Sequence, residues 1–404
     1  MKEGSVTGPV LVLETQTRGG ITFIRSLGEK GIPVVAADCK RLGAAFFSRY
    51  ASRRLLYPDP QTNDVAFREF VFSELARRRY DLLVPIYDST LLPLARTKTE
   101  VERLTRFPFL DYDGLMQGRD KVQAVRIAQQ CGIRTPVTYA VDSEEQVDLA
   151  LDSLELPVIV RPRNTSRSRG LRLVASREQV QGTWREVSGH FGPSVIQEYV
   201  PWGGLTYDVD VLMNRDSEPR AVFVAKRLRT YPPLAGPTAC GQGVEYPELA
   251  SAGVRLLKKM GWYGPAEVEF RIDPRDGQPT LMEVNPRLWG SQYTAKVAGV
   301  DFPYLLYRMA MDGDVEPVLS YKTDRRARYF FNHDLLCMAT HPDRRSVAKE
   351  WFGDFVSPRT SASLVSAKDP LPPLGEILAS LFYGLRPSRF NLRMRDIHEQ
   401  TKAR

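Results

Sequence analysis

Residues 261–292 constrain the fold of this chain more than any other stretch. Two strand-like runs, residues 266–272 and 280–285, flank a turn whose Asp, Pro and Gly residues are typical of a hairpin reversal. Side chains alternate along a strand, so one face of this hairpin is hydrophobic and the other is polar. The polar face consists of Glu267, Glu269, Glu283 and Asn285.

A polar face of this composition predicts a cation site. Clustered carboxylates repel one another, and burying them is costly unless a cation compensates their charge. Mg²⁺ prefers an oxygen shell of this kind, which substrate phosphates can complete. The alternative interpretation is a solvated hairpin at a sheet edge, where exposed carboxylates need no cation.

The end of the second strand favours the cation site, because Glu283 to Arg287 reads Glu-Val-Asn-Pro-Arg. The hairpin, its acidic pair and Glu-x-Asn-Pro-Arg together resemble the metal-binding hairpin of the ATP-grasp superfamily. That superfamily includes D-alanine–D-alanine ligase, carbamoyl-phosphate synthetase and D-aspartate ligase. The resemblance implies that Glu269, Glu283 and Asn285 hold Mg²⁺, with Mn²⁺ as an alternative, against the phosphates of ATP.

Composition is that of an ordinary globular protein of two or three domains. The chain has 404 residues, of which 43% are hydrophobic and 26% charged. It lacks a signal-peptide pattern and any apolar run near the ~20 residues of a spanning helix. Its four cysteines lie far apart without a Cys-x-x-Cys motif, so neither a disulfide framework nor a zinc site is expected. We therefore expect a cytoplasmic protein with no transmembrane segment.

The net charge of +8 raises nucleic acid as a partner. Much of the excess comes from arginines in residues 325–328 and 344–345 and from the tail, residues 386–404. No RNA-binding aromatic signature or helix-turn-helix pattern accompanies them. We expect no specific nucleic-acid partner, because solvated basic faces and anionic substrates such as ATP account for the charge.

The first part of the chain alternates strands and helices. Apolar strand-like runs cover residues 10–13, 34–37 and 82–86, and a helical pattern covers residues 21–30. This alternation predicts a parallel sheet, whose ligands gather beyond the carboxyl ends of the strands. Residues 17–20, Thr-Arg-Gly-Gly, follow such an end and fit either a tight turn or an anion contact. They do not form Gly-x-Gly-x-x-Gly, so no nicotinamide site is predicted.

The middle of the chain resembles the nucleotide-binding part of the superfamily. A predicted helix over residues 120–131 is followed by Gly-Ile-Arg-Thr-Pro, and the resemblance sets Lys121 near the nucleotide. A buried strand then runs into Arg161 and a Ser/Arg/Gly loop, whose composition suits phosphate binding. Relatives usually have Lys-Pro at this strand end; Arg161 keeps the charge and can grip phosphate in a bidentate manner. The expected phosphate contacts are Lys121, Arg161, Arg163, Ser166, Ser168 and Gly170.

Residues 195–204 resemble the linker that recognises adenine in the superfamily, through Glu198, Tyr199 and Val200. Many relatives carry a ribose-binding acid shortly afterwards, and Asp208 is the candidate here, although an acid at a strand start is often merely exposed. The next predicted strand sets Arg227 and Arg229 on one face, as phosphate or carboxylate ligands or as a solvated edge. Residues 231–245 predict a long functional loop. Its Cys240 is expected to be structural, since no His flanks it.

After Arg287 the sequence predicts two helices separated by a turn at Gly299. The stretch NPRLWGS…AGVDFP resembles a group of ATP-grasp proteins classed as carboxylate–amine ligases. Beyond residue 314, residues 377–385 form an apolar, helix-like run followed by arginines. A docking helix is the preferred interpretation, and a membrane-surface anchor is the alternative.

Together these observations predict an α/β chain. A Rossmann-like parallel-sheet domain is expected at residues 1–118. An ATP-grasp domain is expected at 119–313, with a lid at about 135–195, and a C-terminal extension at 314–404.

The resemblance implies an ATP-dependent ligase that forms C–N bonds between amino-acid-like carboxylate and amine substrates through an acylphosphate. Arg287 would steady the transferring phosphoryl group, with Arg227 and Arg229 as further catalytic arginines. The alternatives are a nucleotide-binding protein with altered catalysis and carboxylase or carbamoyl-phosphate chemistry. A homodimer is one option for the oligomeric state, which the sequence leaves open.

Overall fold

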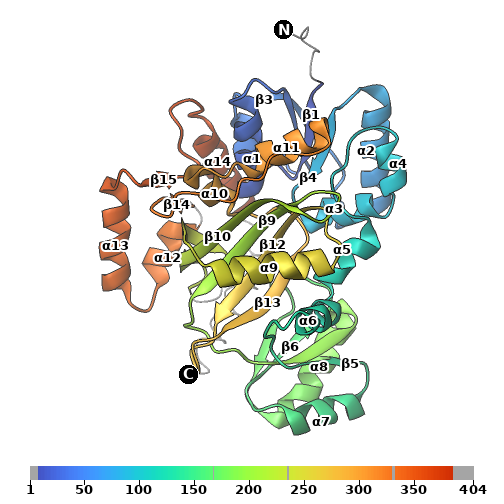
Figure 1. Cartoon of the computed structure of the whole chain (residues 1–404), viewed down its shortest axis with the longest axis vertical. Coiled ribbons are helices and arrows are strands. Elements are labelled where there is room, and N and C mark those ends of the chain that lie inside the picture. The colour runs from blue at the N-terminus through green and yellow to red at the C-terminus, as the bar shows by residue number, and fades with distance from the viewer. Residues whose placement is uncertain (1–7, 167, 234–235, 330–332, 385–404) are drawn as a thin grey trace.

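The computed structural model describes residues 8–166, 168–233, 236–329 and 333–384. The basic tail, residues 386–404, lies outside the described residues. Arg167, which belongs to the predicted lid loop, lies outside them as well. Within them the chain forms a parallel four-stranded sheet, an antiparallel four-stranded sheet and a seven-stranded sheet (Figure 1). This arrangement confirms the predicted α/β class. The domain boundaries at residues 118 and 313 stay predictions.

The first sheet has the order β3-β2-β1-β4, and all of its strand pairs are parallel. Thr17 starts the first helix, because its hydroxyl accepts a hydrogen bond from the amide of Gly20 at 3.1 Å. The elements of this region are β1 (Val10–Leu13), α1 (Arg18–Gly28), β2 (Val34–Asp38), η1 (Ala44–Phe47), β3 (Ala51–Leu56), α2 (Asp64–Arg77), β4 (Leu82–Pro85), α3 (Asp88–Ala95), α4 (Lys98–Glu102) and α5 (Tyr112–Arg119).

The second sheet, β5-β8-β6-β7, is antiparallel and has a small hydrophobic core of its own. It forms the separate lower lobe of the molecule, together with α7 and α8 (Figure 1). Because this lobe shares little core with the rest, it suits a lid. Its elements are β5 (Thr138–Val141), α7 (Glu144–Ser153), β6 (Val158–Pro162), β7 (Arg172–Val174), α8 (Arg177–Phe191) and β8 (Ser194–Glu198). The preceding helix α6 (Lys121–Gln130) packs its buried apolar residues into the main core.

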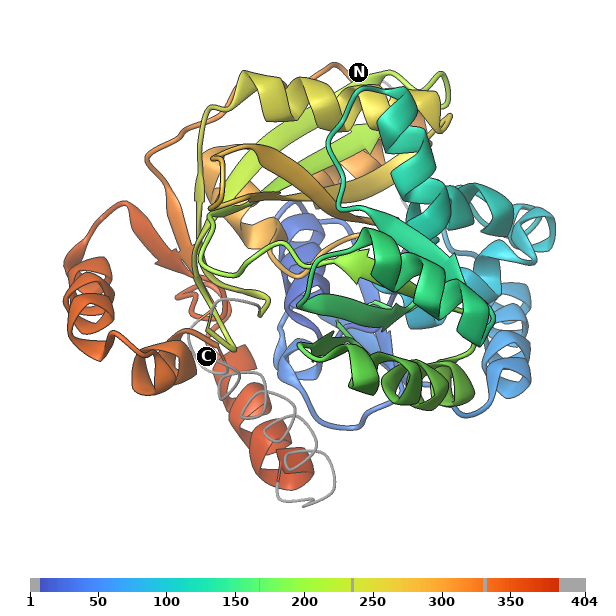
Figure 2. The ribbon, with the colours of Figure 1, turned by 90° about the horizontal axis from the view of Figure 1, so that it is seen from below.

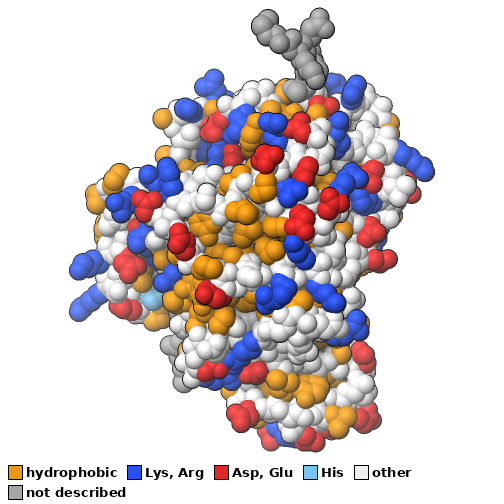
Figure 3. Space-filling model, in the orientation of Figure 1, with side chains coloured by type: hydrophobic (Ala, Val, Ile, Leu, Met, Phe, Trp, Pro, Cys, Tyr) orange, Lys and Arg blue, Asp and Glu red, His pale blue; other side chains and the backbone are white. Residues whose placement is uncertain are grey.

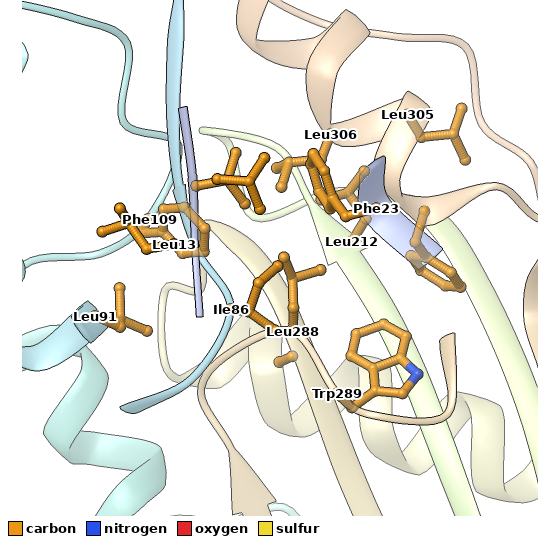
Figure 4. Packing of buried hydrophobic residues seen from close by; sticks show 14 of the residues in the cluster. Leu13, Phe23, Ile86, Leu91, Phe109, Leu212, Leu288, Trp289, Leu305 and Leu306 are labelled. Carbon is orange, nitrogen blue, oxygen red and sulfur yellow. The ribbon is translucent and has the colours of Figure 1, made fainter. Parts of the chain in front are cut away.

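The third sheet has the order β13-β12-β9-β10-β11-β14-β15. Its core is continuous with that of the first sheet: Phe23 and Leu13 lie close to Leu212, Leu288 and Leu306 in one buried cluster (Figure 4). The elements are β9 (Thr206–Met213), β10 (Pro219–Thr230), β11 (Thr238–Gly243), α9 (Pro247–Lys259), β12 (Gly264–Ile272), β13 (Pro279–Asn285), α10 (Gln292–Ala298) and α11 (Phe302–Asp312). The predicted turn at Gly299 is confirmed, since its φ of +106° suits only glycine well.

The prediction of a loop over residues 231–245 is wrong in part, because Thr238–Gly243 form strand β11. This strand pairs with β10 on one side and with β14 on the other. Its glycines serve close packing: a Cβ on Gly243 would lie 2.8 Å from Cε2 of Phe223. The glycines of β11 therefore reflect close packing within the sheet, which local sequence patterns do not reveal.

The C-terminal extension is part of this fold. It contains β14 (Arg326–Arg328), α12 (Leu335–Thr340), α13 (Arg344–Val356), β15 (Thr360–Ala362) and α14 (Pro372–Gly384). β14 extends the large sheet and pairs in parallel with β15. Among the helices described, none has the length and apolarity needed to cross a membrane. Positive and negative side chains are interspersed over the face in Figure 3, so the charge excess forms no continuous basic surface there.

A buried charge network attaches the extension to the sheet. Arg229 on β10 lies 2.7 Å from Asp334 and 2.7 Å from Asp354, and all three side chains are at most 2% exposed. Asp354 also accepts a hydrogen bond from Arg326 at 2.9 Å, and Asp334 accepts one from Arg328 at 2.6 Å. Since an unpaired buried charge is costly, each member of the network depends on the others.

We predict that Asp354→Asn lowers the free energy of unfolding by about 3 kcal/mol. This is the lower end of the range for a broken buried pair, because Asp334 still faces Arg229. Urea denaturation followed by circular dichroism measures the change. The matched control is Glu218→Gln, which breaks the exposed pair between Lys258 and Glu218 and should cost less than about 1 kcal/mol. Equal, small effects of both substitutions would contradict a stabilising role for the network.

Candidate active site

Three adjacent strands bring acidic side chains onto one face of the large sheet. In the hairpin, Glu269 lies opposite Glu283 and Glu267 lies opposite Asn285. On the other side of β12, Asp210 lies opposite Glu267 and Asp208 opposite Glu269. Residues that face each other on adjacent strands point to the same side of the sheet. The predicted acidic face is thus larger than the hairpin alone, since β9 contributes two further carboxylates.

Arginines from other strands neutralise part of this acidic face. Arg227 on β10 lies 2.5 Å from Asp208 and 2.5 Å from Glu269. Arg161, at the end of β6 in the lid lobe, lies 3.1 Å from Glu283. The contacts of Arg227 lie within the large sheet, whereas the contact of Arg161 joins the lid lobe to that sheet through charge.

The deepest carboxylates carry the least compensated charge. Burial, followed by the charge of Asp208, raises the pKa of Glu267 to about 8. Burial and the charge of Glu267 likewise raise the pKa of Asp210. Oδ1 of Asp210 is buried and has no hydrogen-bond partner among the described residues. Both inner carboxyl groups therefore favour their protonated forms unless further positive charge is brought near them.

The outer carboxylates differ from the inner ones. Burial and the nearby Glu283 raise the pKa of Glu269, although Arg227 opposes them. At Glu283 burial is outweighed by the charges of Arg161, Lys121 and Arg287, so its pKa is lowered. Their side chains are 15% and 22% exposed, so both can meet a ligand from solvent.

Arg287 connects the hairpin to the first sheet. Its guanidinium donates hydrogen bonds at 2.9 Å to Oδ1 of Asn285 and to the carbonyl of Leu288. It lies 3.4 Å from Asp88, which follows β4 at the carboxyl end of that strand. Although Asp88 is buried, the charges of Arg287 and Arg119 lower its pKa to about 2. Asp88 is therefore ionised and fixes the direction of Arg287.

Asn285 also orders the carboxylates, because its Nδ2 donates to Glu267 at 3.0 Å and to Glu283 at 3.4 Å. The three predicted metal ligands, Glu269, Glu283 and Asn285, are thus neighbours on one face. Among the described residues no group of three or more His, Cys, Asp and Glu side chains is positioned to hold a metal ion. The predicted metal ligands do not form a group of this kind, because Asn285 would contribute an amide oxygen in place of a third carboxylate.

A cleft runs between the hairpin and the lid lobe. Lys121 on α6 donates hydrogen bonds to the carbonyls of Arg163 and Thr165, at 3.2 Å and 2.8 Å. Burial and the charge of Arg161 lower the pKa of Lys121 well below its usual value. Residues lining the cleft include Lys121, Thr165, Ser166, Gln197, Glu283 and Asn285.

The lid loop follows directly from Arg163, whose guanidinium bonds Asp120 at 2.7 Å. Ser168 and Gly170 have φ values of +54° and +79°, which turn the loop back toward β7. A Cβ on Gly170 would lie 2.7 Å from Cγ of Pro162, so a larger residue does not fit there.

The predicted adenine linker has its own contacts. Glu198 accepts a hydrogen bond from the amide of Val137 at 3.1 Å and pairs with Arg275 at 2.5 Å. The carbonyl of Val200 accepts from Arg271 at 3.2 Å, and the hydroxyl of Tyr199 accepts from the amide of Trp202 at 3.1 Å. These contacts fix the linker against the hairpin and its turn.

The structure brings together Lys121, Arg161, Arg227, Arg287 and the three predicted metal ligands. It does not bring Arg229 to them, because a register shift between Arg227 and Arg229 interrupts the alternation of β10. Asp208, expected at the ribose, is fully buried and paired with Arg227. Sequence reasoning missed Asp210 and Arg119. Asp210 lies two residues from Asp208, so both side chains share one face of β9. The sequence would have indicated Asp210 as a site residue if the pairing of β9 with β12 had been predicted.

Comparisons with known proteins agree with this geometry. Residues 190–330 match the family described as ATP-grasp in the biosynthetic pathway with Ter operon. The carbamoyl phosphate synthase large chain of Mycobacterium sp. (strain JLS) is 24% identical over 339 residues, covering 78% of this chain and 30% of that protein. This chain thus spans about a third of the length of such relatives.

Two solved structures have the same fold. Biotin carboxylase from Campylobacter jejuni, in a β-γ-ATP complex, aligns with a TM-score of 0.63 and 16% identity, over 78% of this chain and 74% of that one. L-amino acid ligase from Bacillus licheniformis aligns with a TM-score of 0.57 and 17% identity, over 78% of this chain and 79% of that one. The family match over residues 190–330, the curated relatives and the shared fold confirm the resemblance to the ATP-grasp superfamily that the sequence predicted.

Proposed function

We propose that this protein is an ATP- and Mg²⁺-dependent ligase that joins a carboxylate to an amine through an acylphosphate. The observation that carries the proposal is the acidic face of β9, β12 and β13, opposed by cations from the lid and from the chain segment after the hairpin. Such an arrangement suits a ligand that contains both a metal ion and phosphates.

The donor set fits Mg²⁺. Glu269 and Glu283 offer partly exposed carboxylate oxygens on adjacent strands, and Asn285 lies beside them. Glu267 and Asp210 lie behind them and favour their protonated forms, so a cation bound in front would favour their ionised forms and would be stabilised by them. When bound there, Mg²⁺ would neutralise charge on the phosphate oxygens.

The cationic side chains suit the phosphates themselves. Arg161 and Lys121 approach Glu283 from the lid side of the cleft and can reach anionic oxygens on the same side. Arg287 lies between Asn285 and Asp88, where it would steady the oxygens of the transferring group. Ser166, Ser168 and Gly170 belong to the loop that would cover the nucleotide, and Glu198, Tyr199 and Val200 to the linker that would contact adenine.

The chemistry needs positioning rather than a protein nucleophile. A substrate carboxylate oxygen attacks the γ-phosphorus, ADP leaves, and an acylphosphate forms. The amine nitrogen then attacks the acyl carbon and inorganic phosphate leaves. Phosphoryl transfer of this kind is accelerated mainly by alignment and charge stabilisation. Burial raises the pKa of Cys240 to about 12, so this thiol is not a nucleophile in the scheme.

Two classes of acid remain in the proposal. The L-amino acid ligase among the structural neighbours supports an amino-acid-like carboxylate. The biotin carboxylase domain of 2-oxoglutarate carboxylase from Hydrogenobacter thermophilus, solved with MgADP and bicarbonate, supports bicarbonate as a second candidate, with carboxyphosphate as the corresponding mixed anhydride. Both candidates use the same phosphate and metal side of the site.

We predict ADP release from Mg²⁺-ATP that depends on one acid from a panel of amino acids, other carboxylates and bicarbonate. Hydroxylamine should trap the acylphosphate of an organic acid as a hydroxamate. Glu283→Gln should lower both products at least ~100-fold, because it removes a charge that acts on the phosphates and metal. Coupled detection of ADP and colorimetric detection of hydroxamate provide the two measurements.

The matched control for this experiment is Glu248→Gln, an exposed position on α9 away from the cluster. It should leave ADP release unchanged. ADP release with bicarbonate alone, without hydroxamate from any organic acid, would favour carboxyphosphate chemistry. Nucleotide binding without any acid-dependent ADP release would contradict the ligase and favour a nucleotide-binding protein.

A second prediction concerns pH. The raised pKa of Glu267, about 8 in the folded protein, means that the folded state holds its proton more tightly than the unfolded state. The stabilisation of the folded state by this more tightly held proton is complete below the ordinary Glu pKa and is lost as pH rises toward 8. Glu267→Gln should therefore lose less stability between pH 5 and pH 8 than the native chain, by about 2 kcal/mol. Urea denaturation at a series of pH values measures this difference.

Added Mg²⁺-ADP should offset this loss of stability at high pH in the native protein. A cation competes with protons for carboxylates, so its stabilising effect should be greater at pH 8 than at pH 6. Thermal unfolding with and without Mg²⁺-ADP tests this expectation.

For the prediction about Glu267, the contradicting outcome is that the stability of the native chain and of Glu267→Gln changes with pH in parallel. Such a result would show that Glu267 does not carry the predicted proton.

A further inference from the structure

Helix α14 attaches to the first domain through one of its faces. Gly375 allows the closest approach: a Cβ there would lie 2.5 Å from Cδ2 of Phe47 and 2.7 Å from the carbonyl of Gly43. Near the other end, the hydroxyl of Tyr383 accepts hydrogen bonds from the amides of Arg41 and Leu42, at 3.1 Å and 3.4 Å. The helix is therefore held at both ends, and its orientation relative to the domain is fixed.

The opposite face of α14 is an exposed apolar stripe. Its residues recur at intervals of three and four, which is the spacing of one helix face. Each is between 36% and 60% exposed: Leu374, Ile377, Leu378, Leu381 and Phe382. Figure 2 shows α14 extending away from the body of the molecule, in agreement with the exposure of these side chains. A continuous apolar surface of this kind indicates an interaction site.

Basic side chains lie near both ends of α14. Lys40 lies 5.8 Å from the centroid of the Tyr383 ring, and the backbone of Arg41 bonds Tyr383. Arg49 and Lys368 are in contact near the start of the helix. All four of these cationic residues are exposed. In sequence, the 19 residues from Arg386 to Arg404 add six Lys and Arg against two Asp and Glu.

We propose that α14 is a membrane-surface helix that inserts its apolar stripe at the edge of a bilayer of anionic lipids. The stripe would enter the acyl boundary while the surrounding cations contact the headgroups. The helix has 13 residues and is thus ~20 Å long, too short to cross the hydrocarbon core and suited to lying in its surface.

A second copy of this chain is the less favoured occupant. Apposing two α14 helices would bring their basic surroundings together, and each chain carries a net charge of +8. Like charges repel at such an interface, whereas an anionic bilayer complements both the stripe and the cations. The charge pattern therefore distinguishes a lipid surface from a protein of the same sequence.

Vesicle flotation of the full chain tests the proposal. The probes are vesicles of phosphatidylcholine alone and of phosphatidylcholine mixed with phosphatidylglycerol. We expect the chain to float with the mixed vesicles at least ~10-fold better than with the neutral ones, and less well as salt is raised. Leu381→Glu should weaken binding at least ~10-fold, because a charge replaces a leucine that would be buried in the bilayer.

The matched control is Leu149→Glu on α7, where the leucine is 64% exposed and far from α14 in the chain. It should float like the native chain, and both variants should keep the native unfolding transition, since each replaced side chain is exposed. Equal binding to both vesicles, no binding to either, or equal losses in the two variants would overturn the proposal. A dimer in lipid-free sedimentation that Leu381→Glu dissociates would assign the stripe to a second copy and also overturn it.

Discussion

The organisation of this molecule depends on compensating one acidic sheet face. Carboxylates from β9, β12 and β13 lie together below the surface, and they can remain ionised only if cations face them. Those cations come from separate segments: Arg227 from β10, Arg161 from the lid lobe and Arg287 from the chain after the hairpin. The same interactions that lower the cost of burying the carboxylates thus connect the three sheets.

This compensation is uneven, and the unevenness has chemical consequences. The charges of Arg161, Lys121 and Arg287 keep Glu283 ionised, whereas burial and repulsion favour the protonated forms of Glu267 and Asp210. The outer row is therefore ready for a metal ion and phosphates, and the inner row responds to any added positive charge. A ligand that brings a cation would change the protonation of groups it does not touch.

Local sequence patterns predicted the parts of the fold that depend on local physics. The alternation and turn residues of the hairpin gave both strands within two residues, and the apolar runs near the N-terminus gave the parallel sheet. β11 and the attachment of the C-terminal extension could not be predicted in this way. The extension depends on pairing between segments far apart in the chain, such as Cys240 with Arg328. β11 itself is short and contains two glycines, so its sequence carries little strand periodicity.

Arg227 and Arg229 illustrate the limit most clearly. In a regular strand, residues two apart share a face, so both arginines would point at the acidic cluster. The register shift in β10 separates them: Arg227 bonds Asp208 and Glu269, while Arg229 bonds Asp334 and Asp354 of the extension. The strand thus takes part in two separate charge networks at the point where its register shifts. Because Arg229 is fixed by the extension, the backbone that directs Arg227 toward the site is fixed with it, which makes the extension a structural support of the acidic face.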